Sequence, residues 1–296
     1  MLNFDLHCHS TTSDGTLTPT EIVTRAAERG VTMLALTDHD DTDGLDEARA
    51  VALQHGMRFI NGVEISVSWR KHTLHIVGLN IDPNHPALVA GLQSVRAGRG
   101  LRAQKMSDEL AKIGISGVMQ GAYKFTTNPN MIGRTHFARY LVEAGHCKDV
   151  KSVFKRYLAS GKPGYVPHEW AQLGDAIAWI KASGGIAVVA HPGRYMIGKN
   201  SMGKKTMHEM LSEFVALGGG AVEVVTGSHT PPQYAEFARY AAEFNLLCSC
   251  GSDFHGPGES YRDLGRLPDL PLGSRPVWEA WDNVPAQTPP ELKAAE

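Results

Sequence analysis

The chain has 296 residues, of which 42% are hydrophobic and 20% charged, as in a soluble globular protein that buries a sizeable core. A formal net charge of −2 argues against the overall basicity of proteins that bind long duplex nucleic acid. No stretch approaches the roughly 18 apolar residues of a membrane span, and the N-terminal residues lack a signal-peptide pattern. The four cysteines form neither a CxxC pair nor a disulfide framework. We therefore expect a cytoplasmic protein with reduced cysteines and no membrane partner.

Short apolar runs alternate with amphipathic segments, which is the pattern of repeated βα units. The expected strands cover residues 3–7, 31–37, 58–67, 73–81, 186–190, 221–225 and 246–251. The expected helices between them cover residues 19–29, 45–54, 173–182, 207–217 and 232–244. The first helix has Thr18 as its cap, Pro19 in its first turn and Gly30 just past its end. Seven strands in this order indicate a βα barrel.

Consecutive helices interrupt the alternation between about residues 84 and 164, and we expect them over residues 87–113, 135–144 and 150–159. We interpret residues 85–164 as a helical insertion that forms a substrate-binding lid. The barrel then comprises residues 1–84 and 165–285, and residues 286–296 form a tail. Within the insertion, Arg99 and Arg102 are three residues apart and share a helical face.

Histidines and carboxylates collect where the expected strands end. His7 and His9 lie two apart on a strand, so both imidazoles point to the same side while Cys8 faces away. Such a pair alone is a weak signal, since two polar residues can simply cap a strand, and His75 between apolar neighbours can pack in a core. Six strands nevertheless end with or carry a donor, and function in βα barrels collects at strand ends. The candidate metal ligands are His7, His9, Asp14, His39, Glu64, His75, His191, Asp253 and His255.

Nine donors are too many for one tetrahedral ion and indicate two or three divalent ions that share carboxylates. Imidazole and carboxylate ligands without thiolate suit Mn²⁺, Fe²⁺ or Zn²⁺, and we favour Mn²⁺. Clustered divalent ions lower the pKa of a bridging water and neutralise the charge of a phosphate. This chemistry is that of a phosphoesterase.

A substrate phosphate beyond the metals would need guanidinium groups, which bind it in a forked geometry. Arg194 follows a candidate ligand by three residues, and Arg134 begins a helix whose N-terminus favours anions. Arg99 and Arg102 would reach the same substrate from the insertion. Each of the four also has the ordinary interpretation of a surface arginine.

The leaving oxygen requires a proton donor, for which Asp40, next to His39, is the candidate. His229 is a second candidate, but its context, Gly-Ser-His-Thr-Pro-Pro, is better explained as an ordinary loop.

The order of these motifs resembles the polymerase and histidinol phosphatase (PHP) family. The motifs run from Asp5 to about Gly258 in this order: His-x-His, Asp-Gly, Thr-Asp-His-Asp, a strand-end Glu, a strand His, Ala-His-Pro and Gly-Ser-Asp-Phe-His. The resemblance implies a distorted seven-stranded (β/α)7 barrel with a trinuclear metal site, in which Glu64 bridges ions. It also implies three groups of ligands, namely His7, His9 and Asp253; Asp14, His39 and His191; and His75 and His255.

More narrowly, the insertion motifs Arg-x-x-Arg and Gly-Arg-x-His, with Ala-His-Pro-Gly-Arg, are similar to the subgroup that includes nucleotide bisphosphate phosphatases. This similarity implies removal of the 3′-phosphate from nucleoside 3′,5′-bisphosphates, such as pAp to AMP, by a metal-bridged hydroxide. It also implies that Arg99, Arg102, Arg134 and Arg194 hold the substrate phosphates. Relatives in this subgroup also trim short RNA, so a 5′→3′ exoribonuclease is the alternative.

Three further interpretations stay open. A histidinol-phosphate phosphatase shares the fold, although the arginine-bearing insertion suits a nucleotide better. An amidohydrolase would have a lysine where Glu64 stands and no histidine after its final aspartate, unlike Asp253-x-His255. A non-catalytic PHP domain would be expected to have lost ligands, whereas this chain keeps all nine. The oligomeric state is not indicated.

Overall fold

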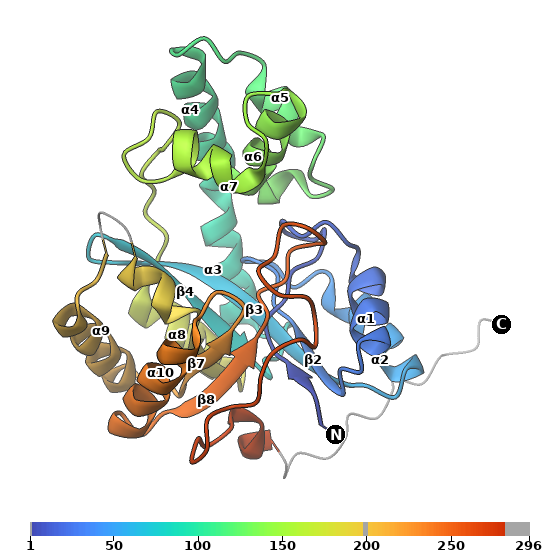
Figure 1. Ribbon diagram of the computed structural model, residues 1–296, viewed down its shortest axis with the longest axis vertical. Coiled ribbons are helices and arrows are strands. Elements are labelled where there is room, and N and C mark those ends of the chain that lie inside the picture. The colour runs from blue at the N-terminus through green and yellow to red at the C-terminus, as the bar shows by residue number, and fades with distance from the viewer. Residues whose placement is uncertain (1, 198–200, 282–296) are drawn as a thin grey trace.

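The computed structural model describes residues 2–197 and 201–281, and the expected tail at 286–296 lies outside the described residues. One strongly twisted sheet forms the lower body, with helices packed around it, and a second group of helices lies above one end of the sheet (Figure 1). Among the described residues, every helix is too short or too polar to traverse a lipid bilayer.

The sheet is a nearly closed barrel of seven strands, which confirms the expected α/β fold. Its strands, in spatial order, are β1 (Phe4–Asp5), β2 (Met33–Leu36), β3 (Arg58–Trp69), β4 (His72–Leu79), β6 (Ile186–Val189), β7 (Ala221–Thr226) and β8 (Leu247–Gly251). The first and last strands meet where the Leu6 amide donates a 3.0 Å hydrogen bond to the Cys250 carbonyl. An eighth, two-residue strand, β5 (Ala171–Gln172), pairs with β3 and is too short to leave a pattern in the sequence.

β4 runs antiparallel to both of its neighbours, β3 and β6, whereas the other pairs are parallel. The reason is local, because only Arg70 and Lys71 separate β3 from β4, and a parallel crossover needs a dozen residues or more. The start of β4 therefore lies at the edge of the barrel where the parallel strands end. His75 sits in this early part of β4, opposite Ser66 of β3.

Five helices cover the outside of the barrel: α1 (Pro19–Glu28), α2 (Leu45–Gln54), α8 (Leu173–Ala182), α9 (Lys204–Ala216) and α10 (Pro231–Glu243). α1 begins as expected, since the Thr18 hydroxyl accepts from the Glu21 amide and the Glu21 carboxylate accepts from the Thr18 amide. The helices bury apolar faces such as Ile177 and Phe214 against strand residues such as Ile65. Short helical turns, η3 (Pro192–Met196) and η4 (Val277–Trp281), complete this part.

The segment between β4 and β5 is helical, as expected, but the single helix expected over residues 87–113 is two. Its elements are α3 (Pro86–Ala97), α4 (Arg99–Ala111), α5 (Val118–Tyr123), η1 (Pro129–Met131), α6 (Arg134–Glu143), α7 (Val150–Val153) and η2 (Phe154–Leu158). α3 and α4 meet at Gly98, where a Cβ would lie 2.5 Å from the His168 ring. α3 packs with the barrel core through Leu88, whereas α4 to η2 have a core of their own around Phe137.

Candidate active site

Glu64 of β3 is the centre of the polar cluster at the open edge of the barrel. Its carboxylate is fully buried. Five ring nitrogens surround it: His39 Nδ1 and His75 Nδ1 at 2.9 Å, His191 Nε2 at 3.0 Å, and His7 Nε2 and His9 Nε2 at 3.3 Å. These imidazoles come from four separate strand regions, so the fold, and not local sequence, brings them together.

Two more carboxylates flank this centre. Asp253 Oδ1 lies 3.3 Å from His9 Nε2 and 3.6 Å from His7 Nε2. Asp14 Oδ1 lies 3.4 Å from His255 Nε2 and 3.9 Å from His39 Nε2. All nine candidate ligands named from the sequence therefore lie in one continuous cluster.

The grouping of the donors differs from the one that the resemblance implies. Three sets have donor atoms within 4.8 Å of one another: His9, Asp14, His39 and His255; His7, His9 and Glu64; and His39, Glu64 and His75. Asp14 thus lies beside His255 and not in a group with His191, which contacts Glu64 instead. The antiparallel β4 explains part of this difference, because it carries His75 to Glu64.

Several donor atoms lie close together without forming a hydrogen bond, which is an arrangement that suits metal ions. The buried atoms Asp14 Oδ1, Glu64 Oε2 and His39 Nδ1 form no hydrogen bond to a described residue, although oppositely polar atoms lie near. His7 Nδ1 is 2.6 Å from Glu223, which leaves Nε2 facing His9 Nε2 at 3.2 Å. Two lone pairs that meet without a proton or cation between them would repel, so these residues fit divalent cations.

Charge and burial keep Glu64 ionised and His9 neutral, whereas nearby carboxylates overcome burial and raise the pKa of His7 and His39. Burial opposes ionisation of Glu64, but the imidazoles of His75, His39 and His7 hold the pKa of its carboxyl well below its usual range. Burial, together with the neighbouring His255 and His39, lowers the pKa of His9 to about 3. A carboxylate and a neutral imidazole are the forms that bind metal.

Glu223, in the middle of β7, is a site residue that the sequence interpretation missed. It is buried, and it accepts hydrogen bonds of 2.6 Å from both His7 Nδ1 and the backbone amide of His191. A carboxylate in this position fixes the tautomer and orientation of a ligating imidazole. The available signal was a glutamate inside the apolar run Ala-Val-Glu-Val-Val.

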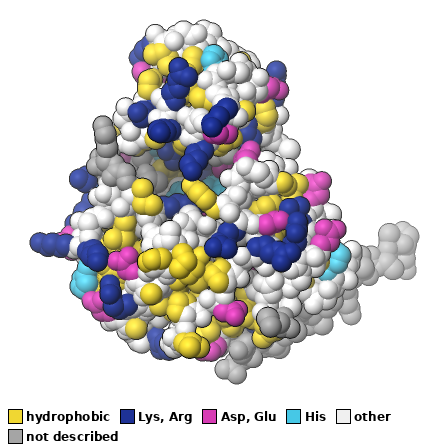
Figure 2. All heavy atoms as spheres, viewed as in Figure 1, with side chains coloured by type: hydrophobic (Ala, Val, Ile, Leu, Met, Phe, Trp, Pro, Cys, Tyr) yellow, Lys and Arg dark blue, Asp and Glu magenta, His cyan; other side chains and the backbone are white. Residues whose placement is uncertain are grey.

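Histidine side chains are visible in a hollow between the barrel and the helices above it (Figure 2). This hollow contains a pocket of about 220 Å³. Its lining residues are Ser13, Asp14, His39, Ser66, His75, Arg99, Arg102, Met131, Gly133, Arg134, Thr135, Phe154, Trp170, Arg194 and His255. Four of the nine candidate ligands, Asp14, His39, His75 and His255, therefore face the same cavity as all four arginines named from the sequence.

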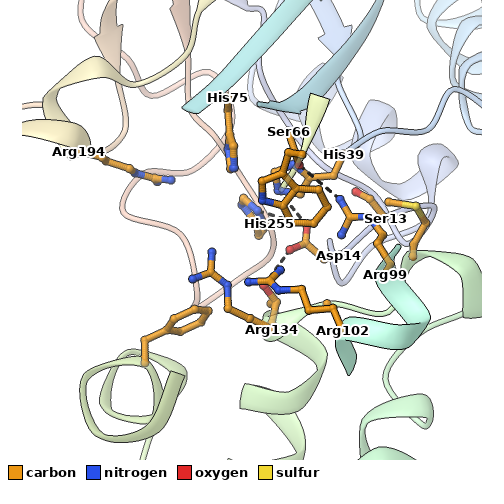
Figure 3. A pocket seen from close by; sticks show the side chains of 15 residues that line it. Ser13, Asp14, His39, Ser66, His75, Arg99, Arg102, Arg134, Arg194 and His255 are labelled. Atoms are coloured by element: carbon orange, nitrogen blue, oxygen red, sulfur yellow. Dashed lines mark hydrogen bonds and ion pairs between the residues drawn. The ribbon is translucent and has the colours of Figure 1, made fainter. Parts of the chain in front are cut away.

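The four arginines surround the imidazoles of His75 and His255 (Figure 3). Arg99 and Arg102 are buried, with their guanidinium carbons 4.9 and 5.1 Å from the centre of the Trp170 ring. Burial, together with the like charges of Arg134 and Arg99, lowers the pKa of Arg102 to about 9. Crowded cations of this kind form a site for an anion that carries more than one charge.

Arg194 is paired with a candidate metal ligand, because it forms an ion pair with Asp253 Oδ2. Burial opposes its charge, yet Asp253 and Glu64 raise the pKa of its guanidinium. Arg194 thus connects the candidate metal cluster with the anion-binding side of the pocket.

The position of Asp40 does not suit a proton donor to the substrate. Its carboxylate is buried, does not line the pocket, and accepts from the Ser66 amide at 2.7 Å and the Ser66 hydroxyl at 2.9 Å. Its second oxygen also forms an ion pair with Arg99. Both oxygens are occupied, so the geometry favours a role in positioning Arg99 over proton transfer.

His229 has the ordinary role expected of it. Its Nε2 accepts from the Gly193 amide at 2.9 Å, and its Nδ1 lies 3.0 Å from the Val224 carbonyl oxygen. Burial lowers the pKa of this imidazole, which keeps it neutral. It secures the turn that carries Arg194.

Comparison with known proteins agrees with the geometry. The family model described as "PHP domain" matches residues 5–227. A 3′,5′-nucleoside bisphosphate phosphatase of Chromobacterium violaceum is 54% identical over 278 residues, which cover 94% of this chain and 96% of the relative. A 5′-3′ exoribonuclease of Haemophilus influenzae is 45% identical over 276 residues, which cover 93% of this chain and 98% of that relative.

A solved structure gives the same result for the fold. The structure, from Chromobacterium violaceum, is described as an amidohydrolase with bound sulfate and no metal. It superposes with a TM-score of 0.90 at 53% identity, over 94% of this chain and 95% of the other.

Proposed function

Because this chain belongs to the PHP domain family, we propose that it is a phosphoric ester hydrolase that removes the 3′-phosphate from nucleoside 3′,5′-bisphosphates. The observation that carries the proposal is a pocket in which four arginines face Asp14, His39, His75 and His255, which belong to the cluster of nine candidate ligands. One phosphate next to the donors and a second on the arginines would use both halves of this pocket. The similarity to a bisphosphate phosphatase over nearly the whole of both chains supports the same substrate class.

We assign the metal ligands to the nine clustered residues: His7, His9, Asp14, His39, Glu64, His75, His191, Asp253 and His255. Glu64 would hold ions through both of its oxygens, since imidazoles approach each of them. The donor set suits two or three divalent ions, with Mn²⁺ favoured over Fe²⁺ or Zn²⁺. When bound, such ions supply an activated water and neutralise charge on the phosphate.

The protein's own residues bind and orient the substrate. Arg99, Arg102 and Arg134 hold the phosphate that is not cleaved, and Arg194 holds the reacting one beside Asp253. Bidentate guanidinium contacts fix phosphates in position as well as neutralise them. Residues 85–164 then form the lid over the barrel, since three of these arginines come from that segment.

The activity belongs in the cytoplasm under this proposal. The described chain carries buried free thiols at Cys8, Cys248 and Cys250, and thiols persist in a reducing compartment.

The test is to compare initial rates of phosphate release from pAp, AMP and histidinol phosphate by the Mn²⁺-loaded protein. A strong preference for pAp is expected, because only that substrate presents a second phosphate to the arginines and a 3′-phosphate to the metals. Comparable slow rates on all three would contradict the assignment.

The second candidate is a 5′→3′ exoribonuclease. Its support is the 45% identical relative with that name and the accessibility of the pocket beneath the insertion. Absence of phosphate release from pAp, together with stepwise shortening of an oligonucleotide, would favour it.

A further inference from the structure

The charge of the chain is divided unequally between its two parts. Residues 85–164 contain 13 Lys and Arg but only four Asp and Glu, whereas the rest of the chain contains 16 Lys and Arg and 27 Asp and Glu. The overall charge of −2 therefore conceals a basic insertion on an acidic barrel. Lys and Arg side chains gather on the insertion above the hollow that contains the pocket (Figure 2). A basic surface of this kind is the electrostatic signature of a polyanion partner.

Part of this charge lines a groove outside the pocket. The groove residues are Gly145, His146, Cys147, Lys148, Ser152, Lys155, Arg156 and Lys162, with no acidic side chain among them. Lys155, Arg156 and Lys162 are exposed and form no salt bridge with a described residue. Like charges that gather without partners repel, so the groove gains stability when an anion binds.

One helical turn separates this groove from the pocket. Phe154, at the start of η2, lines the pocket, whereas its neighbours Ser152 and Lys155 line the groove. A helix is about 10 Å across, so a strand of a few nucleotides that leaves the pocket past Phe154 reaches the basic residues behind it. The pocket volume of about 220 Å³ is too small to enclose more than the end of such a strand.

We propose that the groove lined by Lys148, Lys155, Arg156 and Lys162 binds the phosphate backbone of a single-stranded oligonucleotide whose end occupies the pocket. The contacts are to phosphate, so the groove reads chain length and not sequence. For a nucleoside bisphosphate the groove is out of reach, and the four basic residues do not contribute. This inference depends on the proposed function only for the identity of the strand end, 5′ or 3′, that enters the pocket.

The test uses the full chain with Lys155, Arg156 and Lys162 replaced together by Ala. Binding of a fluorescent 5′-phosphorylated RNA ten-mer is followed by anisotropy in the presence of a chelator, which prevents cleavage. At least a tenfold loss of affinity is expected. The slope of log affinity against log salt should fall by about 2, because each single-strand phosphate contact contributes about 0.7.

The matched control replaces the exposed Lys112, Lys124 and Lys205 by Ala, since this removes the same charge without touching groove or pocket. The control should keep the affinity and salt slope of the parent, and both variants should keep pAp turnover within about twofold of it. The proposal would be overturned by any of three results. These are equal losses of affinity in both variants, an unchanged affinity of the groove variant for the ten-mer, or an equal loss of affinity for a duplex of the same length. Binding is measured without turnover, so failure of pAp hydrolysis would count against the proposed function and leave this result intact.

Discussion

Replacement of Glu223 by Gln tests whether this carboxylate prepares His7 as a metal ligand. The backbone amide of His191 can only donate, so it will keep the single oxygen of the new amide. The amide nitrogen then faces His7 Nδ1, which must become an acceptor. His7 is thereby forced into the tautomer with hydrogen on Nε2, the nitrogen that faces Glu64 and His9.

The expected effect is a 10- to 100-fold loss of metal affinity, the range found when a carboxylate behind a ligating histidine is changed. This loss corresponds to about 1.4–2.7 kcal/mol of binding free energy. The assay is competition for Mn²⁺ or Zn²⁺ between the protein and a chelating dye, with circular dichroism of the metal-free variant to show that the fold is kept.

Glu213→Gln is the control, because Glu213 accepts a 2.9 Å hydrogen bond from Trp69 away from the metal cluster. Its metal affinity should match that of the parent. If Glu223→Gln binds metal as tightly as this control does, the tautomer argument is wrong.

Three other substitutions probe separate features. Asp40→Asn removes the buried partner of Arg99, so it should raise KM for pAp and leave metal affinity unchanged. In urea melts it should lower the free energy of unfolding by up to about 3 kcal/mol. An inactive variant with a normal KM would instead support Asp40 as the proton donor. His136 is buried, which is the main reason that its pKa is lowered to about 4, and Gly133 donates to its Nδ1. In the unfolded chain this imidazole takes up a proton below about pH 6.5, so the free energy of unfolding should fall by at most about 3 kcal/mol between pH 6.5 and 4. His136→Gln should reduce this fall in urea melts across the same pH range. A variant whose stability falls in parallel with that of the parent would contradict the assignment. Gly98→Ala should cost about 1–3 kcal/mol in the same melts, because its Cβ would meet the His168 ring, and an unchanged melting curve would show that the ring moves aside freely.

The sequence predicted the fold well where residue patterns are local. Strands that are buried on both faces appear as apolar runs, and donors that follow such runs are visible one by one. The direction of β4 was not predicted, although the five residues between the strands expected at 58–67 and 73–81 are too few for a parallel crossover. The break at Gly98 could not be predicted, because it depends on His168, seventy residues further along the chain.

In the candidate site, too, features that follow from strand order could be predicted, whereas contacts between distant side chains could not. The nine candidate ligands lie together because most of them follow the ends of parallel strands at one edge of the barrel, while Glu64 and His75 lie within the paired strands β3 and β4. Their grouping depends on side-chain reach across the barrel, so Asp14 lies with His255 and not with His191. The contact between Asp40 and Arg99 could not be predicted, because Arg99 comes from a distant helix, which no spacing rule connects to Asp40.

The junction between the two ends of the barrel has a consequence for how the protein is made. Few backbone hydrogen bonds join β1 to β8: Leu6 to Cys250 at 3.0 Å, and, just beyond the strands, Asp253 to His7 at 2.8 Å and His9 to Phe254 at 2.9 Å. His7 and His9 follow β1, the first strand of the barrel in chain order, whereas Asp253 follows β8, the last. Ions bound between these residues would connect the two ends of the barrel only after both have been synthesised. A chain interrupted before β8 would lack Asp253, so stable metal binding during translation should occur only once the barrel is complete.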